Sequence, residues 1–216
     1  MLADKALLDS LLEYIGKRLN HEVRALLIGG NAMLYYGLRG QTKDMDIVFY
    51  KREDIAAVSQ IVKSHPLYRK ADISKEIPYP MNKEIAGKGN PTFIGGKDIP
   101  RFDLFCKNIF SIDASKIASM RSIRFDLLVL DLPKPEGMIF LKAAADRPQD
   151  REDIVRLAKS FSIDWNILLD ILKEYYKENS KAVFFAVGSL IDINRKEKII
   201  PRDFLEKAAK LFGLEV

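Results

Sequence analysis

Residues 25–50 constrain the fold more than any other part of the chain. They begin with a short apolar run that ends at Gly29-Gly30, continue with a helical pattern up to Gly37, and enter a second apolar run at Asp44-Met45-Asp46. Short apolar runs bounded by glycine and polar turns are typical of buried strands. We therefore expect a strand, a short helix and a second strand in this segment.

The glycine pair and the two aspartates indicate phosphate and metal chemistry. Without a β-carbon, Gly29 and Gly30 let backbone N–H groups approach an anion, and the start of the following helix adds its positive end. Side chains alternate along a strand, so Asp44 and Asp46 project to the same side and repel each other unless a cation or protons intervene. Such oxygen ligands suit Mg²⁺ or Mn²⁺. Taken singly, each feature has an alternative interpretation, a tight strand-to-helix turn or a chance D-x-D string.

The rest of the chain divides into a mixed part and a helical part. Residues 4–19 and 53–62 have the apolar spacing of amphipathic helices, and residues 101–106 have the pattern of a strand. A further apolar run, residues 127–132, precedes the point at which the sequence pattern becomes helical. Beyond it we expect helices at residues 136–145, 150–159, 165–177, 180–191 and 202–212. The predicted fold class is therefore α/β (α+β), with a small mixed sheet flanked by helices.

Residues 75–100 form the longest irregular stretch, with four prolines and four glycines. An irregular segment of this length in a compact domain is usually functional or mobile. Its lysines suit a lid over phosphates, and a solvated loop with a short hairpin at residues 92–94 is the alternative.

Composition and charge narrow the class of protein. Hydrophobic residues make up 48% of the 216 residues and charged residues 30%, as in globular proteins. No stretch approaches the roughly 20 apolar residues of a membrane span, and acidic Asp4 lies where a signal peptide would be basic, so we expect no membrane association and a cytoplasmic location. The formal charge of +5 and the pI near 9.1 favour polyanionic partners such as nucleic acid or nucleotides.

The order of these features resembles the nucleotidyltransferase superfamily that includes DNA polymerase beta-like and transfer-RNA CCA-adding enzymes. The matching residues are Ile28, Gly29, Gly30, Asn31, Ala32, Gly37, Leu38, Arg39, Thr42, Asp44, Met45, Asp46, Ile47 and Asp103. The resemblance implies a palm-type sheet and a two-metal site in which the D-x-D pair and a third aspartate hold Mg²⁺. It also implies nucleotide contacts from the glycine turn and its neighbours, Gly29, Gly30, Asn31, Arg39 and Thr42.

The third carboxylate has two candidates, because the string RFDL occurs twice. Asp103 lies in the first copy and Asp126 in the second. We favour Asp103, which lies in a short strand where the relatives carry this aspartate, whereas Asp126 leads directly into the run that enters the helical part.

A second block resembles the nucleotidyltransferase-like toxins of toxin-antitoxin and abortive-infection systems. It runs from Lys142 to Ile154, and in those relatives the lysine and a following aspartate belong to the active site. By this resemblance Lys142 and Asp150 are catalytic candidates, with Lys142 also binding the triphosphate. Asp153 lies one turn from Asp150, and a helix cap or a solvated face is the alternative role of both. Arg147 either contacts a phosphate or pairs with a neighbouring carboxylate.

The sequence thus predicts a domain of residues 1–132 and a helical domain of residues 133–216 that completes the active-site cleft. The predicted activity is Mg²⁺-dependent transfer of a nucleoside monophosphate from an NTP such as ATP to an acceptor hydroxyl. RNA such as a tRNA 3′ end is slightly favoured as acceptor over small molecules or protein hydroxyls, and a cognate antitoxin is a candidate partner. The alternatives are a non-catalytic nucleotide-binding protein of the same fold and a glycosyltransferase whose D-x-D motif binds a sugar nucleotide.

Overall fold

The computed structural model describes residues 3–76, 90–109 and 112–214. The chain forms two compact units, Met1–Pro133, which contains the strands, and Lys134–Val216, whose described residues form helices and their connections. No helix within the described ranges has the length and apolar character needed to cross a membrane. The mixed α/β architecture expected from the sequence is confirmed.

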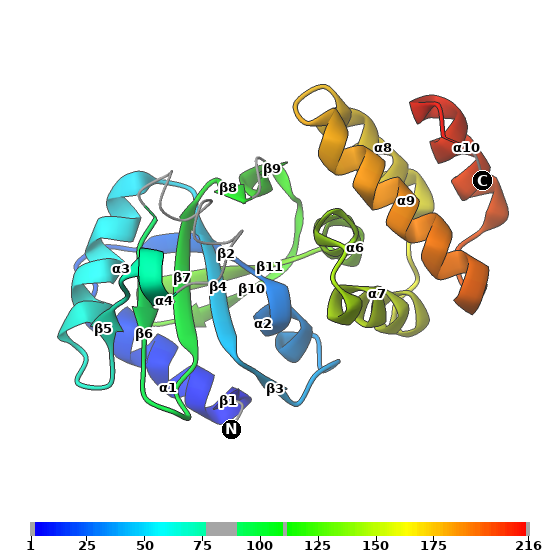
Figure 1. The fold of residues 1–216 in the computed structure, drawn as a ribbon. Coiled ribbons are helices and arrows are strands. Elements are labelled where there is room, and N and C mark those ends of the chain that lie inside the picture. The colour runs from blue at the N-terminus through cyan, green and yellow to red at the C-terminus, as the bar shows by residue number, and fades with distance from the viewer. Residues whose placement is uncertain (1–2, 77–89, 110–111, 215–216) are drawn as a thin grey trace. The chain divides into compact units, whose positions relative to one another are not determined.

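A mixed sheet is the centre of the first unit (Figure 1). Its strands in chain order are β2 (Val23–Ile28), β4 (Asp44–Phe49), β5 (Arg69–Lys70), β6 (Thr92–Ile94), β7 (Arg101–Cys106), β10 (Ser119–Phe125) and β11 (Leu128–Pro133). Among the described residues their order across the sheet is β10-β11-β2-β4-β7-β6-β5. β2 is parallel to β11 and antiparallel to β4, while β4 is parallel to β7. The strands with the predicted aspartates, β4 and β7, are therefore neighbours inside the sheet.

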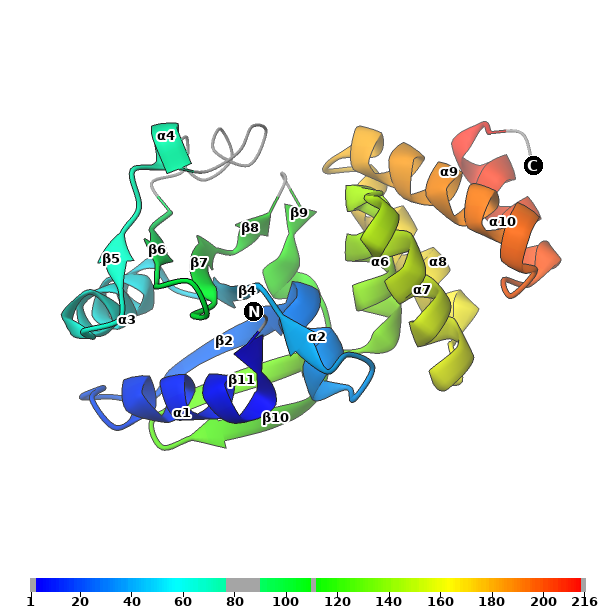
Figure 2. The same cartoon turned by 60° about the horizontal axis from the view of Figure 1, so that its bottom comes forward.

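Alternation along β4 separates an apolar face from a charged one. Met45, Ile47 and Phe49 are fully buried, and Asp44 and Asp46 point to the opposite side. Two helices, α1 (Lys5–Gly16) and α3 (Arg52–Ser64), cover the apolar face; α1 packs on β10 and β11, and α3 packs on β4, β5 and β7 (Figures 1 and 2). Burying each large apolar side chain in this layer contributes about 1.5–3 kcal/mol.

Helix α1 lies unusually close to the edge of the sheet. Its start is capped by Asp4, whose carboxylate accepts a hydrogen bond from the Leu7 N–H at 3.0 Å. At its other end, a β-carbon added to Gly16 would lie 1.7 Å from the carbonyl oxygen of Phe125 in β10. Only glycine therefore permits this approach of helix to strand.

The shorter elements connect this layer. Helix α2 (Gly29–Tyr35) follows β2 without a loop, and α4 (Ile73–Glu76) follows β5. Two small strand pairs, β1 (Ala3–Asp4) with β3 (Gln41–Thr42) and β8 (Asn108–Ile109) with β9 (Ile112–Asp113), flank the sheet, and the 3₁₀ turn η1 (Ala114–Lys116) follows β9. The hairpin expected at residues 92–94 is present, because β6 pairs antiparallel with both β5 and β7.

A polar network joins three strands and Tyr50 on the charged face. The buried carboxylate of Asp131 accepts hydrogen bonds from Arg24 (Nε and Nη2, 2.8 Å each), Tyr50 (Oη, 2.9 Å) and Ser122 (Oγ, 2.6 Å). Burial alone would raise the pKa of Asp131, but these donors outweigh it and hold the pKa below its ordinary value. The carboxylate is therefore a structural anion that ties β2, β10 and β11 to Tyr50, the residue directly after β4.

The second unit contains the helices predicted beyond residue 132. They are α6 (Pro135–Ala145), α7 (Pro148–Ser160), α8 (Trp165–Tyr176), α9 (Ser180–Glu197) and α10 (Arg202–Phe212). Helix α6 packs against α7, α8 and α9. Proline begins α6 and α7 at the first helical position, where its missing N–H has no cost, and Asp164 caps α8.

The close approach of α1 to β10 at Gly16 leads to a prediction about stability. Replacing Gly16 by Ala should lower the free energy of unfolding of the first unit by about 1–3 kcal/mol, because the new methyl group must displace backbone. Urea unfolding followed by circular dichroism measures this. Gly40→Ala is the control, since a β-carbon there meets nothing within 4 Å; equal stabilities of the two variants would contradict the packing described.

Candidate active site

The predicted aspartates lie side by side on the charged face of the sheet. In the parallel pairing of β4 with β7, Asp46 is opposite Asp103 and Asp44 is opposite Arg101. Residues paired across neighbouring strands point to the same face, so three carboxylates converge there. The antiparallel pairing of β2 with β4 brings Ile28, directly before the glycine pair, opposite Asp46. Motifs separated by many residues in sequence thus meet at one end of the sheet.

Gly29, the first residue of the glycine pair, lies against this carboxylate cluster. Gly29 has a φ of +67°, and a β-carbon there would lie 2.3 Å from Oδ2 of Asp46. A β-carbon at Gly30 would lie 2.6 Å from Oγ1 of Thr42 and 3.3 Å from Nη1 of Arg39. The first glycine is therefore needed for a left-handed turn and for the close approach of Asp46.

The carboxylate of Asp103 is fully buried and bonded at both oxygens. Its Oδ1 accepts a hydrogen bond from Oγ1 of Thr92 at 2.7 Å. Its Oδ2 lies 2.8 Å from Nε and 2.7 Å from Nη2 of Arg101. The same guanidinium lies 3.3 Å from Oδ1 of Asp44. Burial opposes the positive charge of Arg101, but the charges of the three aspartates outweigh it and raise the pKa of the guanidinium.

This arrangement fits a divalent metal in part. Asp44, whose side chain is 41% exposed, and its neighbour Asp46 offer carboxylate oxygens on one face, which is the donor chemistry that Mg²⁺ and Mn²⁺ prefer. Asp103 does not fit as it stands, because Arg101 fills Oδ2 and Oδ1 accepts from Thr92 in β6, on the side of β7 away from β4. Accordingly, the described residues contain no group of three or more His, Cys, Asp or Glu side chains arranged to hold a metal ion.

The two candidates for the third carboxylate lie at opposite ends of the sheet. Asp126 is exposed and has a φ of +56° in the tight turn between β10 and β11. Next to it, the carbonyl of Leu127 accepts a hydrogen bond from the N–H of Val23, at the beginning of β2. Asp46 is paired with Ile28 at the end of that strand. Geometry therefore favours Asp103 over Asp126.

The predicted nucleotide contacts differ in how accessible they are. Arg39 is partly exposed beside Gly30, while Thr42 is buried and donates a hydrogen bond to the carbonyl of Asp44 at 3.0 Å. Asn31 is fully buried, and its side-chain amide has no hydrogen-bond partner in the part of the chain that the structure describes. Helix α2 has only seven residues, so its dipole adds little to anion binding. The phosphate cradle stays a prediction that rests on the glycine backbone.

Lys142, Asp150 and Asp153 form a buried ion cluster within the helical unit. Nζ of Lys142 in α6 lies 2.9 Å from Oδ1 of Asp150 and 2.6 Å from Oδ2 of Asp153, both in α7. Arg147 donates to the other oxygen of Asp150. Burial would raise the pKa of Asp150, but the Arg147 hydrogen bond and the Lys142 charge lower it overall. The roles of Lys142, Asp150 and Arg147 in catalysis or phosphate binding stay predictions.

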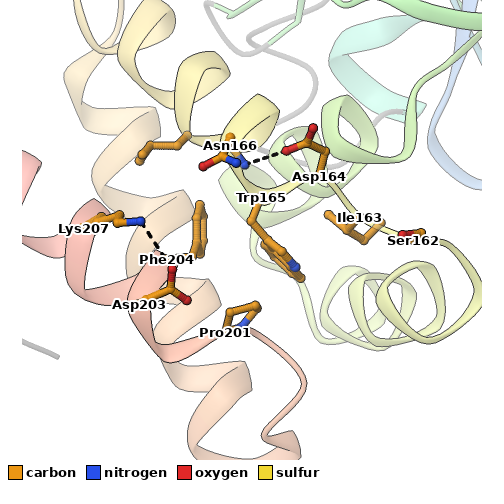
Figure 3. Close-up of a pocket in the computed structure, with 10 residues that line it drawn as sticks. Ser162, Ile163, Asp164, Trp165, Asn166, Pro201, Asp203, Phe204 and Lys207 are labelled. Atoms are coloured by element: carbon orange, nitrogen blue, oxygen red, sulfur yellow. Dashed lines mark hydrogen bonds and ion pairs between the residues drawn. The ribbon is translucent and has the colours of Figure 1, made fainter.

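A hollow of about 450 Å³ lies between α8 and α10 in the helical unit. Figure 3 shows Trp165 and Phe204 facing it, with their ring centres 5.1 Å apart. Its polar groups have local partners: Asp164 accepts from the N–H of Asn166, and Asp203 pairs with Lys207. None of the predicted site residues lines it.

Arg101 is the site residue that the sequence did not assign. It lies two positions before Asp103 on a strand, and that spacing puts both side chains on one face. An Arg-x-Asp pair in a strand was therefore the available signal. Thr92 carried no comparable signal, because only the pairing of β6 with β7 brings it opposite Asp103.

No protein-family model matches the sequence, and no match was found among curated proteins. Among solved structures, the chain is similar to an antigenic nucleotidyltransferase-like protein from Paracoccidioides brasiliensis, with a TM-score of 0.55 and 15% identity, covering 97% of this chain and 95% of that one. A proposed nucleotidyltransferase from H. pylori matches with a TM-score of 0.43 and 19% identity, covering 98% and 93%. The first likeness shows that this chain has a nucleotidyltransferase-like fold, as predicted.

The contact between Gly29 and Asp46 is testable by a matched pair of glycine variants. Gly29→Ala should lower the free energy of unfolding by about 1–3 kcal/mol through its positive φ, and by a further amount through the clash with Asp46. Gly37 is the control, since its φ is +80° but a β-carbon there meets nothing within 4 Å. Urea unfolding compares the two variants; an equal loss in both would show that Asp46 does not lie against Gly29.

The buried ion cluster of the helical unit predicts that the stability of this unit depends on pH. Because the pKa of Asp150 is lowered in the folded state, its stabilisation is present above the unfolded pKa of about 3.9 and is lost as pH falls through the folded value. Asp150→Asn should therefore cost about 2 kcal/mol at pH 7 and progressively less below about pH 4. Urea unfolding between pH 7 and pH 3 tests this, with the exposed Asp170→Asn as control. If Asp150→Asn lowered the free energy of unfolding equally at every pH, the lowered pKa given for Asp150 would be contradicted.

Proposed function

We propose that this chain is a metal-dependent nucleotidyltransferase that moves a nucleoside monophosphate from a nucleoside triphosphate to an acceptor hydroxyl. The observation that carries the proposal is the pairing of Asp46 with Asp103 on one face of the sheet, with Gly29 against Asp46. The likeness of the fold to a nucleotidyltransferase-like protein supports the same reaction class.

In the proposed reaction, the acceptor oxygen bonds to the α-phosphorus while the bond from that phosphorus to the leaving pyrophosphate oxygen breaks. Asp44 and Asp46 would hold Mg²⁺ or Mn²⁺, which when bound neutralises phosphate charge and lowers the pKa of the attacking hydroxyl. Asp103 would join them as a ligand of the metal ion on the acceptor side and take up the hydroxyl proton, which requires that Arg101 release its carboxylate.

The remaining predicted residues would bind the triphosphate. The backbone N–H groups of Gly29 and Gly30 approach the phosphates without steric hindrance from a side chain, and Arg39 adds a positive charge beside Gly30. Lys142 and Arg147 stay predicted phosphate contacts; within the helical unit, Lys142 now pairs with Asp150 and Asp153, and Arg147 with Asp150.

The charge of the chain slightly favours RNA as the acceptor. A formal charge of +5 and a pI near 9.1 favour a polyanion, and RNA such as a tRNA 3′ end supplies both the negative charge and a terminal hydroxyl. Small-molecule and protein hydroxyls are the alternatives that the same site chemistry accommodates.

A second candidate function is supported by one specific contact. Arg101 already neutralises Asp103 and Asp44, so a protein that binds a nucleotide without transferring it would retain this ion pair permanently. Such a protein would keep the fold and the glycine turn and lack turnover.

Transfer is tested by incubating the protein with each α-labelled NTP, Mg²⁺ and total RNA, and separating the products by size. We expect label in one RNA size class, and Asp46→Asn should reduce that incorporation at least about a hundredfold. Asp126→Asn is the matched control, because Asp126 is exposed at the far end of the sheet and Asn tolerates its positive φ. Label in other molecules would identify a different acceptor. NTP binding without any transfer would favour the non-catalytic candidate.

A further inference from the structure

The guanidinium of Arg101 lies where the acidic cluster would otherwise need a cation. It makes two contacts with Oδ2 of Asp103, at 2.8 and 2.7 Å, and one with Oδ1 of Asp44, at 3.3 Å. The side chain of Asp103 is 0% exposed and that of Arg101 21% exposed, so water screens this pair weakly. Without Arg101, the fully buried carboxylate of Asp103 would face Asp46 and keep only the Thr92 hydroxyl among the contacts given for it.

A divalent ion and Arg101 compete for the same oxygens. Arg101 donates twice to Oδ2 of Asp103 and also contacts Asp44, so it fills both lone pairs of the oxygen that shares a cation with β4. Oδ1 keeps one lone pair, but it accepts from Thr92 in β6, on the side of β7 away from β4. Asp44 is different, since its side chain is 41% exposed and Arg101 touches it at the longer distance. An incoming ion therefore reaches Asp44 and Asp46 before it can reach Asp103.

We infer that Arg101 is an internal counter-ion that controls metal binding, so that Asp103 joins the metal site only when Arg101 moves off its carboxylate. Arg101 is a positioning residue in this scheme, because it acts through Asp103. The inference rests on the proposed function in taking the three aspartates as metal ligands, and it does not depend on which acceptor is used. It accounts for an acidic trio in register that nevertheless presents no three-carboxylate metal site.

The direct test is a titration of the apo protein with Mn²⁺ followed by electron paramagnetic resonance of the free ion, with no nucleotide present. Arg101→Met removes the charge and keeps much of the side-chain volume, and we expect it to bind Mn²⁺ at least about fivefold more tightly than the wild type. Arg124→Met is the matched control, since Arg124 forms an exposed pair with Glu22 in the same unit; its Mn²⁺ affinity should equal that of the wild type.

Thermal unfolding supplies an independent measurement. Arg101→Met should melt at a lower temperature than the wild type without metal, because Asp103 has lost its partner, and Mn²⁺ should raise its melting temperature more than that of the wild type. In the double variant Arg101→Met with Asp103→Asn, the melting temperature without metal should fall less than in Arg101→Met alone. The gain in Mn²⁺ affinity should disappear. A purely structural Arg101 would not produce this Mn²⁺ response.

Arg101→Lys keeps the inference testable if the methionine variant does not fold. A lysine ammonium retains the charge but cannot form the same forked contact while reaching Asp44, so Mn²⁺ affinity should rise in the same direction by a smaller factor. Variants that bind Mn²⁺ no more tightly than the wild type would overturn the inference, even if the wild type transfers nucleotides. Tighter Mn²⁺ binding in a protein that transfers nothing would uphold it and reject the proposed function.

Discussion

Carboxylates on neighbouring strands repel one another. The stability of the sheet where Asp46 and Asp103 meet depends on how that repulsion is relieved. Asp46 and Asp103 are paired across β4 and β7, and Asp103 is removed from water. An uncompensated charge in that position would cost several kcal/mol. Arg101, on the same strand as Asp103, supplies the compensation through contacts shorter than 3 Å. The contacts of Arg101 with Asp103 and Asp44 therefore stabilise the cluster.

The backbone around the cluster determines where its carboxylates lie. β2 and β4 run antiparallel, so the end of one and the beginning of the other meet, and the left-handed turn at Gly29 leaves room for the Asp46 carboxylate. The apolar face of the sheet, covered by α1 and α3, fixes β4 from the opposite side. Packing thus holds the aspartates at a defined spacing, which metal-assisted phosphoryl chemistry requires.

The sequence predicted the mixed α/β fold, the strand bearing the D-x-D motif and the helices after residue 132, because strong periodicity and glycine or proline boundaries determine such elements locally. It missed β10, since residues 119–125 are mostly exposed and polar and lack an alternating apolar pattern. It also left Arg101 without a role, although the spacing to Asp103 was visible. Strand pairing decides which residues meet, as for Thr92 and for the network around Asp131, and that information is not local. Asp126 shows the same limit, because only the sheet topology places it at the far end.

The most direct measurement is to locate Mn²⁺ by anomalous X-ray diffraction in crystals grown with a non-hydrolysable NTP. We expect an anomalous peak within ligand distance of Asp44 and Asp46, with the guanidinium of Arg101 moved away from Asp103. A peak at those carboxylates with the Arg101–Asp103 contacts unchanged would contradict the role given to Arg101. Nucleotide bound elsewhere, with no Mn²⁺ at Asp44 and Asp46, would show that this end of the sheet is not the site of chemistry.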